Sequence, residues 1–282
     1  RVRMLFFRKR ELIAITGAGG KTSLALVLGS LLSRDCKVVL TTTTHIGCGE
    51  LPSSVAHFSG NLKEVFRKLE ELQKADSFFA IVTRGRERGK FTGFTSKEVD
   101  SLFKSDLCDL IIVEADGASG FPVKGYKSHE PVIPGLTTCQ IVIVGAEIFF
   151  KPMDVTTVFR LTQFLSDFRL MEGTILSSPS IALVLESPQG FLKGSPENED
   201  MRRILLINKV DLLRDMPDCQ QKVRETFSML KRFNLAGTAV LRGNGYGSAD
   251  PGCGIIDTNG EGQASSAIWR KNGFIICNRL CR

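Results

Sequence analysis

A glycine-rich segment near the start of the chain has the composition of a phosphate-binding loop. Residues 13–24 read IAITGAGGKTSL, an apolar run followed by glycines, a lysine and a threonine. Glycines let backbone N–H groups crowd around an anion, and a helix that begins at the lysine adds the positive end of its dipole. The lysine would contact the β- and γ-phosphates, and the threonine hydroxyl would bind Mg²⁺. We therefore expect the phosphates of GTP or ATP to be bound by Gly17, Ala18, Gly19, Gly20, Lys21, Thr22 and Ser23.

The loop departs from the full G-x-x-x-x-G-K-[ST] pattern, because Ile15 stands where the first glycine would be. It has the shorter T-G-x-x-G-K-T form, which is similar to that of the Mur ligases. An ATP-dependent ligase or kinase therefore stays open as an alternative, and it would use His129, Lys127 or Lys124 on an acceptor. A plain glycine turn is the simplest alternative, but the lysine and threonine in register favour a phosphate site.

An apolar segment at residues 110–113 ends in two carboxylates, Glu114 and Asp116. Parallel strands bring their carboxyl ends to one edge of a sheet, so either side chain can reach a Mg²⁺ ion held by Thr22. A solvated strand end would explain the same carboxylates without a ligand. Next to the glycine loop we favour a metal site of Thr22, Glu114 and Asp116. We assign catalysis to Lys21 and Asp116, which would act mainly by positioning and charge neutralisation.

A second apolar run, at residues 204–207, leads into Asn208, Lys209 and Asp211, which match the N-K-x-D motif of GTPases. The Asp211 carboxylate would accept hydrogen bonds from guanine, Asn208 would fix the loop, and the Lys209 stem would lie along the base. Adenine would leave that carboxylate unpaired, which costs about 1–3 kcal/mol. The motif therefore favours GTP over ATP. A polar loop after a strand is the alternative.

These residues need a scaffold, and short apolar runs that alternate with helical patterns predict one. Such alternation is typical of βαβ units. The pattern predicts strands at 12–16, 37–42, 79–83, 110–114, 140–144, 204–207 and 238–241, and helices at 22–32, 61–75, 155–168 and 220–233. The predicted fold class is α/β, with a doubly wound, mainly parallel sheet of the P-loop NTPase type. We expect residues 1–241 to form this domain and residues 242–282 to be a flexible, glycine-rich tail.

The composition excludes several functions. The net charge is +7, but lysines and arginines are not clustered with stacking aromatics, so nucleic acid is not an expected partner. Apolar runs fall far short of the ~20 residues that span a bilayer, so no membrane association is expected. Eight cysteines are scattered without a CxxC pair, which is typical of reduced thiols in a cytoplasmic protein.

Six segments, in order, resemble those of the YqeC family, whose members are regarded as accessory proteins of selenium-dependent molybdenum hydroxylases. They are TGAGGKTSL at 16–24, TTTTHIG at 41–47, VEADGASGFPVK at 113–124, HEPVIP at 129–134, GFLKGSP at 190–196 and LLINKVD at 205–211. The resemblance implies a single P-loop domain that matures a client metalloenzyme or its cofactor. The segment from Glu114 to Gly117 also looks like the E-x-x-G of metal-insertion GTPases that serve hydrogenase and urease.

The chain departs from the family at two places. Beyond about Leu241 its glycine-rich stretch is unlike the family, and nothing is carried over to it. The family commonly has a His-Arg pair after the strand that ends near residue 145, whereas this chain has Phe159 and Arg160. No role is therefore carried over to Arg160. A third hypothesis, a nucleotide-gated scaffold that does not hydrolyse its ligand, stays open beside the slow triphosphatase and the ligase.

Overall fold

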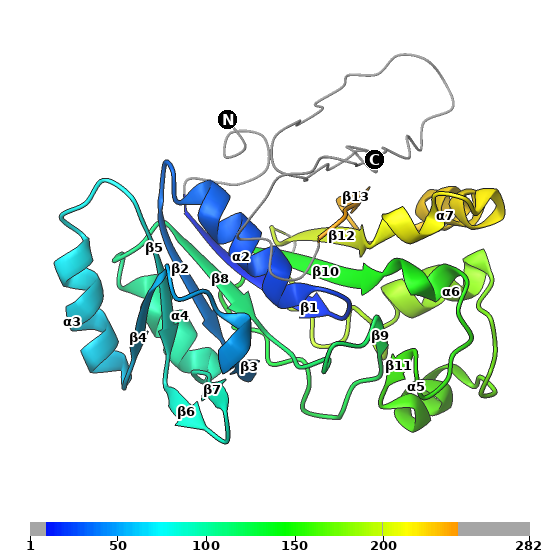
Figure 1. The fold of residues 1–282 in the computed structure, drawn as a ribbon, viewed down its shortest axis with the longest axis horizontal. Coiled ribbons are helices and arrows are strands. Elements are labelled where there is room, and N and C mark those ends of the chain that lie inside the picture. Colours follow the sequence, from blue (N-terminus) through cyan, green and yellow to red (C-terminus); the bar gives the residue numbers. More distant parts are fainter. Residues whose placement is uncertain (1–9, 199, 242–282) are drawn as a thin grey trace, which may run out of the picture.

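The computed structural model describes residues 10–198 and 200–241. Its centre is an eight-stranded sheet in which every pair of neighbouring strands is parallel (Figure 1). In spatial order the strands are β13 (Leu235–Thr238), β12 (Arg202–Asn208), β10 (Cys139–Gly145), β1 (Glu11–Gly17), β8 (Leu110–Glu114), β2 (Lys37–Thr42), β5 (Phe78–Thr83) and β4 (Ala56–Ser59). The predicted α/β fold with a mainly parallel sheet is confirmed.

Helices cover both faces of this sheet (Figure 1). Helix α2 (Lys21–Leu32) packs on one face, against alternate residues such as Ile13 and Ile15. On the other face lie α3 (Leu62–Leu72) and α4 (Ser96–Lys104) over one half of the sheet, and α5 (Leu161–Phe168), α6 (Ser178–Glu186) and α7 (Pro217–Met229) over the other half. Because both faces are buried, an inner strand such as β8 is apolar from Leu110 to Val113 and becomes polar only at its end, Glu114.

Two small sheets and three single turns complete the described chain. Strands β3 (His45–Gly47), β7 (Lys90–Thr92) and β6 (Gly85–Glu87) form an antiparallel sheet, and β9 (Val123–Lys124) pairs with β11 (Val158–Phe159). The turns are the 3₁₀ segments η1 (Cys48–Glu50), η2 (Ala146–Phe149) and η3 (Val210–Leu213). None of the helices in the described ranges has the length and apolarity needed to cross a bilayer.

Several predicted elements differ from the structure at their ends. The helix expected at 155–168 begins only at Leu161, because the Asp154 carboxylate accepts from the N–H groups of Thr156 and Thr157 and closes a turn there. The helix expected at 220–233 is α7, which starts earlier, at Pro217, a residue that suits the first turn of a helix. The last strand is Leu235–Thr238 rather than 238–241.

Two helices were not predicted. Helix α4 begins after Thr95, whose hydroxyl accepts from the Glu98 N–H while the Glu98 carboxylate accepts from the Thr95 N–H. This reciprocal pair is a helix-start signal that is readable in the sequence. Helix α6 begins after Ser177 in a similar way. The predicted tail at 242–282 lies outside the described residues.

Candidate functional site

The glycine loop, residues 17–20, joins β1 to α2 in a backbone conformation that favours glycine. Gly17, Gly19 and Gly20 have φ angles of 101°, 88° and 130°. A Cβ atom on Gly17 would lie 2.1 Å from the carbonyl oxygen of Ile143, which belongs to the neighbouring strand β10. The loop is therefore pressed against the sheet, and side chains at these positions would push it away.

Backbone N–H groups of the loop divide into two sets. Those of Gly17 and Ala18 are used internally, since Gly17 donates to Asp116 Oδ2 over 2.9 Å and Ala18 donates to Ile143 O over 2.8 Å. The N–H groups of residues 19–23 have no acceptor among the described residues, and we call this second set the amide nest. Unpaired N–H groups at a helix start are suited to bind an anion.

Lys21 folds back over the loop. Its Nζ donates to Gly17 O over 2.9 Å and lies 3.2 Å from Asp116 Oδ1 and 3.9 Å from Glu114 Oε1. The side chain is only 4% exposed. The lysine thus lies beside the amide nest, and its charge is balanced by carboxylates.

The Thr22 hydroxyl lies between two carboxylates. It is 2.9 Å from Glu114 Oε2 and 2.9 Å from Glu50 Oε2, although a hydroxyl has one hydrogen to donate. Burial raises the pKa of Glu114 to about 7, against the lowering effects of Lys21 and the Thr22 hydrogen bond. Two carboxylates and a hydroxyl are hard oxygen ligands, which fit Mg²⁺.

This set does not form a complete metal cage by itself. No group of three or more histidine, cysteine or carboxylate residues in the described ranges is arranged to hold a metal ion. Mg²⁺ bound to a nucleotide usually takes one or two protein carboxylates and completes its shell with phosphate oxygens and water. The observed donors suit that mode. Glu50 was not predicted, because it comes from the η1 turn, 28 residues from Thr22, without a local motif.

Asp116 is fully buried and faces a second lysine. Its Oδ2 atom lies 3.3 Å from Lys124 Nζ, which also donates to Gly117 O over 2.6 Å. The ammonium group stands 4.4 Å from the centre of the Tyr126 ring. Burial lowers the pKa of Lys124, while the charge of Asp116 acts in the opposite direction. Lys124, which the ligase alternative would use on an acceptor, is an interior counterion.

The ion pairs continue outward from Lys124 through Glu130 to Arg160. Glu130 Oε2 lies 3.4 Å from Lys124 Nζ, and both carboxylate oxygens accept from the Arg160 guanidinium. Burial raises the pKa of Glu130, but Arg160 and Lys124 outweigh this effect and hold that pKa below its ordinary value. Pairing of β9 with β11 sets Phe159 opposite Lys124 and so brings Arg160 to this site. Arg160 therefore has a structural partner that the sequence did not indicate.

The N-K-x-D motif, which begins at Asn208, is hydrogen-bonded to the glycine loop through Asn208. Asn208 Nδ2 donates to Gly19 O over 2.7 Å, and Oδ1 accepts from Leu241 N over 2.8 Å. Asn208 is fully buried. Lys209 and Asp211 do not contact the glycine loop, and no hydrogen bond or ion pair joins the Asp211 side chain to another described residue.

Lys209 is held by a carboxylate that sequence reasoning missed. Its Nζ lies 2.8 Å from Glu147 Oε1. Glu147 is 7% exposed, and its Oε2 atom has no hydrogen-bond partner among the described residues. It belongs to η2, directly after β10, so it lies at the same sheet edge as the glycine loop. Its position could be inferred only from the strand order.

Other residues that could have taken part in a ligand site make contacts that do not point to one. Thr42 donates to Glu114 O and Thr43 to Val132 O, so these hydroxyls are committed to backbone oxygens. His45 is exposed on β3, and His129 is exposed on the loop before Pro131. The structure brings neither histidine to the glycine loop through a hydrogen bond.

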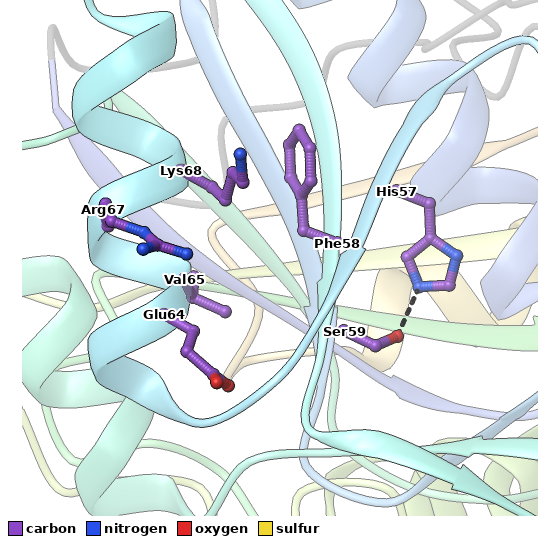
Figure 2. Close-up of a pocket in the computed structure, with 7 residues that line it drawn as sticks. All are labelled: His57, Phe58, Ser59, Glu64, Val65, Arg67 and Lys68. Carbon is purple, nitrogen blue, oxygen red and sulfur yellow. Dashed lines mark hydrogen bonds between the residues drawn. The ribbon is translucent and has the colours of Figure 1, made fainter.

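A surface hollow of about 340 Å³ lies elsewhere, between β4 and α3 (Figure 2). It is lined by residues that include His57, Ser59 and Arg67, and Figure 2 shows Ser59 and His57 joined by a long hydrogen bond of 3.5 Å. Strand β4 is the edge strand of the sheet, three strands beyond β8. The hollow therefore takes no part in the candidate site.

Comparison with known proteins identifies the family. The model of the YqeC protein family matches residues 13–162, which include the glycine loop, Glu114, Asp116 and the ion pairs up to Arg160. The chain belongs to the YqeC family. A relative, "Uncharacterized protein YqeC" of Escherichia coli (strain K12), is 31% identical over 208 residues, which cover 72% of this chain and 77% of the relative. No solved structure matches the chain. The YqeC model match ends before Asn208, so the base motif lies outside it.

Proposed function

We propose that this protein is a P-loop nucleotide-binding protein that takes a nucleoside triphosphate, with GTP favoured over ATP. The observation that carries the proposal is the amide nest, residues 19–23, beside the Lys21 ammonium group. Free backbone N–H groups, a helix N-terminus and a lysine together form a site for a chain of phosphates. Gly17 and Ala18, whose N–H groups are used internally, would shape the loop rather than contact the ligand.

Strand order supports this proposal. The acid-bearing strand β8 is the direct neighbour of β1, and β12, which ends in Asn208, lies beyond β10 on the other side. Ligands of open parallel sheets bind outside the carboxyl ends of the strands, which is where these three strands present their polar residues. Asn208 links the base motif to the glycine loop through Gly19.

Mg²⁺ would be held by Thr22 with Glu114, and Asp116 and Glu50 stand close enough to take part directly or through water. The ion would neutralise phosphate charge. Lys21 would bind the phosphates, and Asp116 would position both Lys21 and the Gly17 amide. We name no general base, and we propose slow hydrolysis by positioning and charge neutralisation.

Guanine selection would fall to Asp211, because its carboxylate is unpaired among the described residues and follows Asn208 at the same sheet edge. The ligase-like alternative loses one of its acceptor-handling residues, since the Lys124 side chain has 0% exposure and lies in ion pairs. We further propose, from the resemblance of the six segments, that the protein is an accessory factor. It would act on a client metalloenzyme of the selenium-dependent molybdenum hydroxylase type, or on its cofactor.

Calorimetric titration tests the nucleotide proposal. We expect GTP with Mg²⁺ to bind more tightly than ATP or UTP. We expect Lys21→Ala to abolish triphosphate binding while the fold persists, since it removes the charge that would contact the phosphates and Lys124 still pairs with Asp116. Lys193→Ala is the matched control, because within the described ranges the Lys193 side chain bonds only to the Lys127 carbonyl group. Equal triphosphate affinity of Lys21→Ala and wild type would mean that the glycine loop is only a turn and not a phosphate-binding site.

A further inference from the structure

Two lysines share one buried aspartate at the centre of the candidate site. Lys21 Nζ lies 3.2 Å from Asp116 Oδ1, and Lys124 Nζ lies 3.3 Å from Asp116 Oδ2. The Asp116 side chain is 0% exposed, so water does not screen its charge. Either lysine alone would be a sufficient counterion. The presence of both requires an explanation.

Ligand binding would affect the two lysines differently. Lys21 adjoins the amide nest, so a phosphate chain would draw its ammonium group away from Asp116. A buried carboxylate that loses its only partner is strongly destabilised. If Lys21 were the sole counterion, each binding event would therefore leave an uncompensated charge beneath the loop, and affinity would fall accordingly.

Lys124, by contrast, is fixed in place. Its Nζ also donates to Gly117 O over 2.6 Å, and the Tyr126 ring lies beneath it. The next carboxylate, Glu130, is bonded through both oxygens to Arg160. Because Arg160 takes up most of the Glu130 charge, Lys124 remains available to Asp116.

We propose that Lys124 is a positioning residue that serves as the permanent counterion of Asp116 and thereby releases Lys21 to bind phosphate. The inference rests on the proposed triphosphate site and names the residue that keeps it open. Asp116 then holds the Gly17 amide and the loop in place in both states, with or without ligand. Arg160 supports the arrangement from the surface by occupying Glu130.

Charge balance makes this proposal distinguishable from a purely structural role. Lys124→Met leaves Asp116 with Lys21 as its only cation, so the lysine is held back and phosphate binds more weakly. Asp116→Asn in the same chain removes the charge that holds Lys21, so binding returns. A residue that merely fills space would show no such recovery, because the second substitution disturbs the packing further.

The test is calorimetric titration of GTP, and of inorganic tripolyphosphate, in EDTA, so that loss of a metal ligand at Asp116 plays no part. We expect Lys124→Met to weaken both ligands by about tenfold or more, a change of roughly 1.4 kcal/mol or more. Lys124→Met/Asp116→Asn should return to within about threefold of wild type. Lys193→Met should match wild type, because no hydrogen bond or ion pair in the described part of the chain joins the Lys193 side chain to Asp116. Circular dichroism melts confirm that each variant is folded.

A second pair of variants covers the case in which Lys124→Met does not fold. Arg160→Gln frees Glu130 to draw Lys124 from Asp116, so it should weaken tripolyphosphate binding, and adding Asp116→Asn should restore it. Wild-type affinity in Lys124→Met would overturn the inference, and so would wild-type affinity in Arg160→Gln if the second pair is used. A double variant with Asp116→Asn that binds as weakly as the corresponding single variant would also overturn it. Wild type that binds neither ligand, with or without Mg²⁺, would instead overturn the proposed function itself.

Discussion

The side-chain amide of Asn208 donates to the carbonyl oxygen of Gly19 across 2.7 Å and so ties the end of β12 to the glycine loop. The Oδ1 atom of Asn208 accepts from the Leu241 N–H, and the whole side chain is buried. One residue therefore fixes two backbone segments that are far apart in sequence. Its loss would leave a buried acceptor and a buried donor unpaired.

We expect Asn208→Ala to lower the free energy of unfolding by about 2–4 kcal/mol, because two buried hydrogen bonds lose their shared partner. Urea denaturation measures this change. Asn234→Ala is the matched control, since the side chain of exposed Asn234 accepts a single hydrogen bond from the described residues, from Arg203 N, and its loss should cost less than about 1 kcal/mol. Equal costs for the two variants would contradict a bracing role for Asn208.

The backbone of the glycine loop yields a second prediction. Gly17→Ala should lower the free energy of unfolding by more than about 3 kcal/mol, because it combines a positive φ with a collision against Ile143 O. Gly89→Ala isolates the strain alone, since Gly89 has φ 74° and nothing within 4 Å of the new Cβ. Its expected cost is about 1–2 kcal/mol. Similar values for both variants would mean that the loop can move off the sheet.

The raised pKa of Glu114 predicts how stability depends on pH in the ligand-free protein. Since burial raises this pKa from 4.5 to about 7, the folded state binds more protons than the unfolded state between these values. The contribution of Glu114 to stability must therefore fall as pH rises through this window. Glu114→Gln, which has no titrating group, should gain about 1–3 kcal/mol over wild type between pH 4.5 and about pH 8. Parallel stability curves in a pH series of melts would show that Glu114 keeps its ordinary pKa.

Base selection can be tested at Asp211. Asp211→Asn replaces one acceptor oxygen with a donor amide, which would face the amino group of guanine. Xanthine has a carbonyl group at that position and would accept from the new amide, so the variant should prefer xanthosine over guanosine nucleotides by about tenfold or more. Competition with a fluorescent nucleotide measures the preference. A wild type that binds ATP as well as GTP, with a variant indifferent to the base, would remove the guanine assignment.

The parts of the site that could be predicted lie within single strand-to-loop segments. Lys21 and Thr22 follow β1 directly, and Glu114 ends β8, so an apolar run with polar residues after it was sufficient. The structure brings Lys21, Thr22, Glu114 and Asp116 together, as expected. Sequence reasoning assigned Asp116 to the metal and did not foresee its bond to the Gly17 amide.

The residues that the sequence did not predict are brought to the site by contacts between elements that are far apart in sequence. Glu50 reaches Thr22 from a turn whose place depends on the small antiparallel sheet of β3, β7 and β6. Arg160 reaches Glu130 through two-residue strands, β9 and β11, which are too short for a periodic pattern. Glu147 holds Lys209 only because β10 and β12 are neighbours. Contacts of this kind follow from strand order, which local periodicity does not specify.

The hydrogen bonds that shape the glycine loop also set the order in which the protein can assemble. Gly17 bonds to a residue 99 positions later, and Gly19 bonds to Asn208, 189 positions later. Neighbours of β1 in the sheet likewise come from β8 and β10, not from the strand that follows in sequence. Long-range closures of this kind are slow and depend on prior folding of the intervening chain. During synthesis, the glycine loop can therefore be completed only after Asn208 has emerged, and a nascent chain that ends before Asn208 has no finished loop to bind a ligand.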